Sequence, residues 1–450
     1  MTATPTPADI VPSHPRKRHA TVFIIMDAGR ADYVDQDSMP FLHALSQGSL
    51  RGSFESPPGF AQRTVLFSGR YPDTSGNFSA FVFDPEESPF TWVRKLGPLR
   101  SLVKPRKILF PARWGINKAT KLLNGTYHAD PAWIPPKFLP FFRPCEDMRP
   151  LFEPGALGAA SIFDLCRAHD LRFRYLAHPV SGDDEDVHAT LVREIRAGAP
   201  YDLYVAQLST PDQQGHVHGP ASEAMRKGYM REMDRKVASV HAALAASHAS
   251  WDLFICGDHG MATVERRIDI LGALKNARAK PAKDYVVFVN STLAVFWYLT
   301  DKGRREIEAI LPRIPGTEVI DDARRKKLRI PTDRRWGDRM LAAQAGVLFW
   351  PDYFHVKDST IKGMHGYLDK KDETHGMMVI AGSEGRARAG DVGLRPLVDV
   401  FPTLCDLLGV PVPKTQEGTS ILSNGHSLPP QAPLIPVTSP VTARPPNAMK

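Results

Sequence analysis

The 450-residue sequence predicts an α/β fold: a doubly wound, mostly parallel sheet with helices on both faces and inserted cap segments. The first observation is that short, continuous apolar runs alternate along the chain with amphipathic stretches of helical periodicity. The second is that the apolar runs are typical of strands buried on both faces. In such a sheet ligands bind beyond the carboxyl ends of the strands, so the residues that follow each strand matter most.

The alternation of strands and helices can be followed in order. Four apolar runs and the helical stretches between them set the pattern: TVFIIM (21–26) before a helix at 39–48, FRYLAHP (173–179) before a helix at 187–198, YDLYVAQL (201–208) before a helix at 221–247, and WDLFIC (251–256) after it. Each crossover is long enough to return the chain to a parallel neighbour.

Composition divides the chain into a domain, two inserts and two ends. We expect one large domain over 19–422. The arm 1–18 and the tail 423–450 are polar and rich in proline, so both are expected to be disordered. A basic, aromatic and proline-rich insertion spans about 92–150, and a small α+β lobe spans about 268–362.

Charge and cysteine content narrow the functional classes. The net charge is +8, and nine Lys and Arg residues lie between Arg94 and Arg143 against the single acid Asp130. Such a patch suits an anionic phosphorylated metabolite, and it leaves nucleic acid or a membrane surface open as partners. Four scattered cysteines favour buried thiols over a disulfide framework. No transmembrane segment or signal peptide is expected, which predicts a cytoplasmic enzyme.

Acidic and imidazole side chains follow three of the strands. They are Asp27 after the first run, Asp212 and His216 after the third, and Asp258 and His259 after the fourth. The spacing of Asp212 and His216 places both on one face of a helical turn. Two further histidines, His365 and His375, follow later in the chain. Because Asp and His are ligands that zinc accepts, the set predicts a metal site at one edge of the sheet.

The ordered series of motifs resembles the alkaline phosphatase superfamily, in its type I phosphodiesterase and nucleotide pyrophosphatase branch. The motifs are LFSGRYPDTSGN (66–77), PDQQGHVHGP (211–220), GDHGM (257–261), WGDRML (336–341), HGY (365–367) and DVFPTLCDLLGVPVP (399–413). The resemblance runs from about residue 20 to 422, and it implies that the domain over 19–422 is an alkaline phosphatase-like catalytic domain.

This resemblance implies a site for two Zn²⁺ ions, with another divalent metal as an alternative. It assigns Asp212, His216 and His365 to one ion, and Asp27, Asp258 and His259 to the other. Such a pair clamps the attacking and leaving oxygens of an in-line displacement at phosphorus. His375 is the rival of His365 as a ligand, and the HGY motif favours His365.

The sequence departs from this family at the nucleophile. Relatives use a Thr or Ser ten residues before the glycine of an [ST]-G-x-Y-P element, and here that position is Gly59, counted from Gly69. The same glycine argues against a sulfatase. Three alternatives stay open: Thr64 as the catalytic hydroxyl, Ser56 if its loop folds back, or attack by a zinc-bound hydroxide.

The predicted function is a zinc-dependent hydrolase of phosphate esters, most simply a phosphodiesterase or pyrophosphatase with a two-metal site. One alternative is a phosphoryl or phosphoethanolamine transferase or mutase of the same superfamily. Those relatives also need a covalent residue, so Gly59 argues against them. The other alternative is a non-catalytic, metal-stabilised protein that binds a polyanion through its basic insertion.

Overall fold

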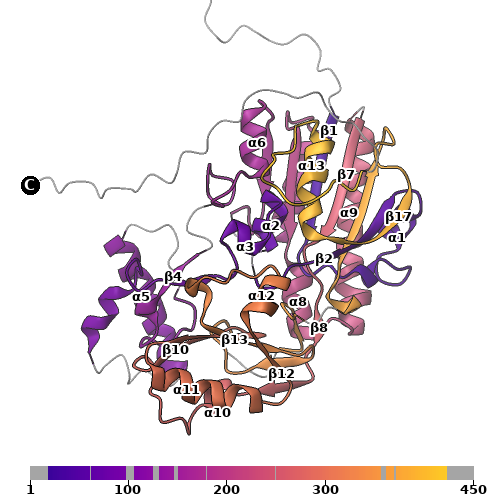
Figure 1. Ribbon diagram of the computed structural model, residues 1–450. Helices are drawn as coiled ribbons and strands as arrows, with labels where there is room; N and C mark the ends of the chain where they lie inside the picture. Colours follow the sequence, from indigo (N-terminus) through magenta and orange to yellow (C-terminus); the bar gives the residue numbers. More distant parts are fainter. Residues whose placement is uncertain are drawn as a thin grey trace, which may run out of the picture.

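A computed structural model describes most of the chain (Figure 1). The described residues are 19–60, 62–97, 106–124, 131–145, 150–178, 180–248, 250–355, 361–368 and 371–422. The predicted arm 1–18 and tail 423–450 lie outside them. Among the helices of the described ranges, none combines the length and the hydropathy that a bilayer span requires.

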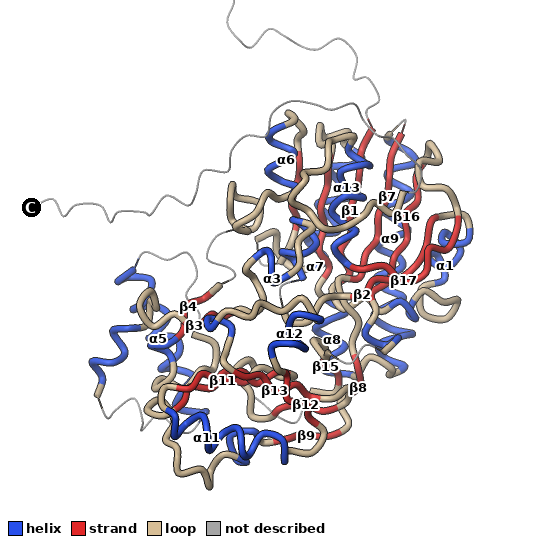
Figure 2. The backbone as a smooth tube through the Cα atoms, viewed as in Figure 1, coloured by secondary structure: helices blue, strands red, loops and turns tan. Residues whose placement is uncertain are grey.

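The larger part of the molecule is built around a seven-stranded sheet (Figure 2). In spatial order its strands are β17 (Gly390–Pro396), β2 (Leu50–Glu55), β16 (Gly376–Gly382), β7 (Ser250–Gly257), β1 (His19–Met26), β6 (Leu203–Leu208) and β5 (Phe173–Leu176). Only β16 pairs antiparallel, with both of its neighbours. All six residues of β6 are buried, as expected for a strand covered on both faces. The predicted fold class is confirmed.

Helices cover both faces of this sheet because alternate residues of each strand point to opposite sides. In β1, Val22 enters one core and Phe23 enters the other. The helices of the first core are α1 (Pro40–Gln47), α7 (Asp184–Arg196) and α9 (Arg231–Ser247). Those of the second are α2 (Gln62–Ser68), α6 (Ile162–Ala168) and α13 (Val400–Leu408).

The strands β1, β6 and β7 end in register. Met26 at the end of β1 pairs with Leu208 of β6 on one side and with Gly257 of β7 on the other. The chain that follows each of these strands therefore emerges at the same edge of the sheet. After β6 it enters α8 (Thr210–His218) at once.

The predicted small lobe contains a four-stranded antiparallel sheet. In spatial order its strands are β10 (Tyr285–Val289), β11 (Leu293–Tyr298), β13 (Arg339–Ala343) and β12 (Thr317–Ile320), with helices α11 (Asp301–Ile310) and α12 (Asp322–Lys327) nearby. Four shorter elements lie outside these two sheets: α3 (Pro72–Ser75), β9 (Arg266–Ile268), α10 (Ile270–Ala273) and β14 (Val347–Phe349). The strands β9 and β14 pair in parallel.

The aromatic part of the predicted insertion packs into the core of this lobe. Phe142 contacts Phe288 and Trp297 edge-on, with ring centroids 5.5 and 5.4 Å apart. The strands β3 (Phe81–Phe83) and β4 (Phe142–Pro144) pair here. The helix α5 (Arg106–Asn124) lies at the outer edge of the lobe, away from the strand ends at α8 (Figure 1).

Candidate metal centre

Six side chains predicted to bind metal belong to segments that meet at the carboxyl edge of the main sheet. We call them the strand-end cluster: Asp27, Asp212, His216, Asp258, His259 and His365. Five of them follow β1, β6 and β7 directly or within α8. His365 arrives from far along the chain because β15 (Gly363–Met364) pairs with β8 (Ala262–Thr263), just after the β7 end.

Two groups of three side chains bring ligand atoms within 4.8 Å of one another: Asp27, Asp258 and His259, and then Asp212, His259 and His365. The first group is the triad that the family resemblance implies for one ion. The second contains His259 in place of His216, so His259 is shared by both groups. His216 Nε2 nevertheless lies 3.3 Å from Asp212 Oδ1, and His365 Nε2 lies 3.4 Å from the same oxygen.

Backbone carbonyls set the orientation of two imidazoles. The ring nitrogen Nδ1 of His216 lies 2.8 Å from the Gly363 carbonyl oxygen, and Nδ1 of His259 lies 2.8 Å from that of Gly260. Since a carbonyl can only accept, Nδ1 carries the proton in each ring. Nε2 of each ring then faces the carboxylates and is the atom that would bind an ion, as in metal sites where a second contact fixes the orientation of the ligand.

The carboxylates of the cluster are also held from behind. Asp258 Oδ1 accepts hydrogen bonds from the backbone N–H groups of Ala28 and His259, at 3.2 and 3.0 Å. Ala28 adopts φ +55°, a left-handed conformation that residues other than glycine rarely take. Asp27 Oδ2 accepts from the buried amide Nε2 of Gln207 at 2.9 Å.

Gln207 is a site residue that the sequence analysis missed. It is the one polar side chain of the apolar strand LYVAQL, and that position was its only sequence signal.

The electrostatics of the cluster fit a bound cation. Burial raises the pKa of Asp258 to about 7, with Asp27 adding to the shift. Burial alone would lower the pKa of His259, but Asp258 and Asp27 outweigh it and raise this pKa to about 10. Buried carboxylates this close together are costly without positive charge between them. The donor set of carboxylates and imidazoles is the one that zinc and similar ions accept.

His365 and His375 occupy different places. His365 stacks on His259, with ring centroids 4.0 Å apart, and burial lowers its pKa, which keeps it in the neutral form that binds metal. His375 belongs to neither ligand group, and its backbone carbonyl accepts from Ala31 N at 3.0 Å. His365 therefore lies in a candidate ligand group and His375 does not, and the choice of His365 as a ligand stays a prediction.

We therefore expect His365→Ala to lower turnover by more than about 100-fold, beyond the range typical of residues behind the ligands. His375→Ala should lower it by less than about tenfold. Steady-state kinetics and metal content of the two variants, measured side by side, check this. Equal losses in both, or a larger loss in His375→Ala, would contradict the ligand assignment.

The candidate hydroxyls lie in contrasting surroundings. Thr64 is 1% exposed within α2, and its Oγ1 accepts from Asn77 Nδ2 at 3.2 Å. Ser56 donates a hydrogen bond to the Asp258 backbone carbonyl, so it lies beside the strand-end cluster. Gly59 has φ +95°, and a β-carbon there would approach the Phe78 carbonyl oxygen to 2.4 Å. Among the three, the structure brings only Ser56 into hydrogen-bond contact with the backbone of a cluster residue.

A second Asp–His pair stands next to the cluster. His355 Nδ1 lies 2.8 Å from Asp352 Oδ2, and Ser291 Oγ donates to the same oxygen at 2.8 Å. The His355 ring contacts the His216 ring edge-on, with centroids 5.7 Å apart. Sequence reasoning missed this pair because it lies in an irregular segment that no strand or helix pattern marks.

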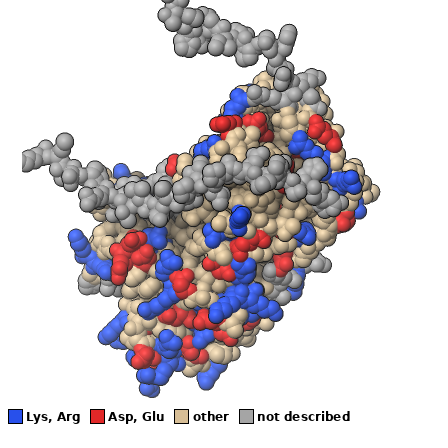
Figure 3. All heavy atoms as spheres, turned by 45° about the horizontal axis from the view of Figure 1, so that its top comes forward, with Lys and Arg blue, Asp and Glu red and all other residues tan. Residues whose placement is uncertain are grey.

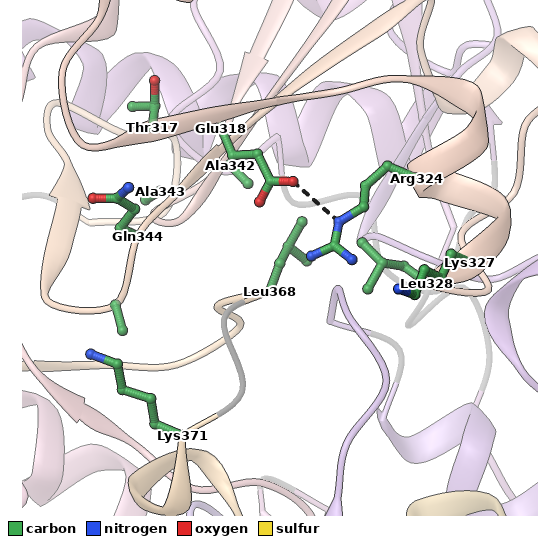
Figure 4. Close-up of a pocket in the computed structure, with 11 residues that line it drawn as sticks. Thr317, Glu318, Arg324, Lys327, Leu328, Ala342, Ala343, Gln344, Leu368 and Lys371 are labelled. Carbon is green, nitrogen blue, oxygen red and sulfur yellow. Dashed lines mark hydrogen bonds and ion pairs between the residues drawn. The ribbon is translucent and has the colours of Figure 1, made fainter.

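A cavity of about 810 Å³ opens in the small lobe, between β12, β13 and α12 (Figure 4). Lys327, Lys371 and Arg324 line it, and Arg324 is paired with Glu318 at 3.1 Å. No member of the strand-end cluster is among the described residues that line it. The cavity and the candidate metal centre are therefore different places.

Comparison with known proteins agrees with this geometry. The profile of the family described as "Type I phosphodiesterase / nucleotide pyrophosphatase" matches residues 21–368. No curated protein matches the chain.

Solved structures similar to the chain include murine and human ectonucleotide pyrophosphatase / phosphodiesterase 5. Both are 16% identical with TM-scores of 0.64, and the match covers 89% of this chain and 98% and 97% of theirs. An inactive variant of the murine protein in complex with AMP matches equally well, at 16% identity and a TM-score of 0.64. At this identity the likeness shows the fold alone.

Proposed function

We propose a reaction for this chain, which belongs to the type I phosphodiesterase / nucleotide pyrophosphatase family. The proposed reaction is hydrolysis of nucleotide-type phosphodiesters or pyrophosphates, with two bound zinc ions. The family is one of phosphoric ester hydrolases. The AMP complex of the murine relative supports the nucleotide-type substrate. Another divalent metal in the same site would leave the reaction class unchanged.

One observation carries this proposal: two ligand groups lie next to each other at the ends of parallel strands, so close that His259 reaches both. Adjacent ligand groups are what a two-metal site requires, and because one imidazole nitrogen binds one ion, His216 would complete the second group. A single structural metal would need only one closed set of ligands. The arrangement therefore favours a reacting site over a structural one.

The roles of the chain's own residues follow from their contacts. Asp27, Asp258 and His259 would hold one ion, and Asp212, His365 and His216 would hold the other. When bound, the ions would neutralise charge on the phosphoryl oxygens. Gln207 keeps Asp27 in place through its amide. The bond of His355 Nδ1 to Asp352 leaves Nε2 of that ring to hold or pass a proton beside the site.

We infer that water is the nucleophile. Gly59 offers no hydroxyl, and the Thr64 hydroxyl is buried and bonded to Asn77. Ser56 directs its proton to a backbone carbonyl, which cannot act as a base. A side-chain nucleophile is activated by a base within hydrogen-bond reach or by a bound metal. The described contacts of these two hydroxyls supply no base, and the Ser56 hydroxyl is turned to a backbone carbonyl.

Turnover tests the proposed function. The full chain, purified without chelator, is expected to hydrolyse bis(p-nitrophenyl) phosphate faster than the monoester, and to lose this activity on chelation and regain it with Zn²⁺. Elemental analysis should find about two transition-metal ions per chain. Metal-loaded protein without turnover of either ester or of a dinucleotide would contradict it. That result would favour the alternative of a non-catalytic, metal-stabilised protein that binds a polyanion.

The nucleophile has its own test. We expect Thr64→Ala and Ser56→Ala to keep turnover within about fivefold of the unchanged protein, or about 1 kcal/mol of barrier. A chiral phosphorothioate diester should be hydrolysed with inversion, because a single in-line displacement inverts phosphorus and two displacements retain it. Retention, with an adduct trapped on Ser56 or Thr64, would contradict attack by water.

A further inference from the structure

The outer surface of α5 is apolar and exposed. In the part of the chain that the structure describes, seven large apolar side chains are exposed, and the three most exposed all belong to α5. They are Trp114 at 67%, Leu122 at 86% and Leu123 at 63% of full exposure. Apolar side chains gathered on one exposed surface mark a site of interaction.

Two of these three side chains, Trp114 and Leu122, share one side of the helix with two exposed lysines, whereas Leu123 lies on another side. We call Trp114, Lys118, Lys121 and Leu122 the α5 face. Trp114, Lys118 and Leu122 are spaced by four residues, so they form a stripe about 12 Å long. Lys118 Nζ lies 5.0 Å from the centroid of the Trp114 ring. On the opposite side of the helix, Ile116 and Thr120 are buried.

Charge distinguishes this helix from the rest of the surface. Between Arg106 and Asn124 the sequence has five Lys and Arg residues and no acid. On the face of the molecule that Figure 3 shows, by contrast, Lys and Arg are interspersed with Asp and Glu. A helix with only positive charge attracts an anionic surface, and its apolar residues need a partner that also buries them.

We propose that the α5 face docks on an anionic phospholipid surface. Trp114 and Leu122 enter the boundary between headgroups and acyl chains, where tryptophan is favoured. Lys118 and Lys121 extend their apolar stems along that boundary and place their ammonium groups at the lipid phosphates. The helix lies on the membrane and does not cross it, since its charge excludes a span.

Two other occupants fit the face less well. A second copy of the chain would bring Lys118 and Lys121 against their own equivalents, which costs free energy. A nucleic acid would pair with the lysines and stack on Trp114, but Leu122 neither stacks on a base nor bonds to a phosphate. Of these three occupants, the lipid surface satisfies both the charge and the aliphatic side chains.

Flotation of the full chain with vesicles tests the proposal. We expect binding to vesicles of phosphatidylcholine with phosphatidylserine, and little binding to phosphatidylcholine alone. The double variant Trp114→Ser/Leu122→Ser should bind at least about tenfold more weakly, because two buried apolar groups are lost. Lys118→Glu/Lys121→Glu should weaken binding about 25-fold or more, at roughly fivefold for each lost attraction.

The matched control is Val180→Ser/Leu394→Ser, which removes two side chains exposed at 58% and 46%, one in a turn and one in β17. The control should bind vesicles as the unchanged chain does. All variants should have the circular dichroism spectrum and the melting temperature of the unchanged chain. Equal weakening in the control, or binding that ignores phosphatidylserine and the lysines, would overturn the proposal. The proposal would also be overturned if no protein bound vesicles and the unchanged chain instead formed a dimer or retained nucleic acid that the α5 variants lost.

Discussion

Asp258→Ala is expected to lower phosphodiester turnover by about a thousandfold or more, equivalent to at least about 4 kcal/mol of barrier. The substitution removes a carboxylate of the group shared with Asp27 and His259. It also leaves the Ala28 N–H without the acceptor that now holds it at 3.2 Å. We expect the metal content to fall by at least one ion in the same preparation. Elemental analysis and steady-state kinetics on one sample measure both effects.

Asp212→Ala should act in the same way, because Asp212 Oδ1 lies within 3.4 Å of Nε2 in both His216 and His365. The matched control is Asp234→Ala. Asp234 is a carboxylate as buried as that of Asp258; it lies in α9 and accepts from the backbone N–H groups of Phe41 and Leu42 in α1, at 2.9 and 2.8 Å.

Loss of the Asp234 contacts should lower the free energy of unfolding and leave metal content unchanged. If Asp234→Ala removed activity and metal as completely as Asp258→Ala, the loss would report a general defect in folding. The assignment of the strand-end cluster would then fail.

The main sheet and five members of its site could be predicted because both depend on local pattern. Apolar runs give the strands, and in a parallel sheet the residues after Met26, Leu208 and Gly257 must emerge at one edge. The position of His365 required the family resemblance, since it reaches the site through the pairing of β15 with β8. Nothing near His365 in the sequence specifies that pairing.

Contacts between distant segments could not be predicted. The sharing of His259 by two ligand groups depends on the stacking of His365 on it, across more than a hundred residues of sequence. The support of Asp27 by Gln207 depends on the alignment of β1 with β6. His355 and Asp352 approach the cluster from an irregular segment, where periodicity gives no guidance.

Gly59→Thr is the substitution that would restore a hydroxyl at the position where relatives carry one, and we expect it to destabilise the protein instead. Gly59 has φ +95°, and its β-carbon would meet the Phe78 carbonyl oxygen at 2.4 Å and the Phe78 ring at 2.8 Å. That carbonyl already accepts from Phe60 N at 3.1 Å, so moving it would break a backbone contact of the loop. The left-handed conformation costs a threonine about 1–3 kcal/mol, and overpacking adds about 1–3 kcal/mol.

Gly76→Thr separates these two costs. Gly76 also has a left-handed conformation, φ +74°, at the end of α3, but nothing lies within 4 Å of its β-carbon position. The Gly76→Thr variant should lose only the conformational part of the free energy of unfolding, about 1–3 kcal/mol in urea denaturation, so the difference between the two variants measures the clash with Phe78.

Gly59→Thr should gain no turnover and form no phosphothreonine, since the loop that would present the hydroxyl is built around a glycine. The opposite result would have three parts: a Gly59→Thr protein as stable as the unchanged chain, a trapped adduct on the introduced hydroxyl, and retained configuration at phosphorus. Together they would show that the loop can adopt the geometry of the relatives. In that case the covalent route would be open to this fold, and one side chain would decide whether it is used.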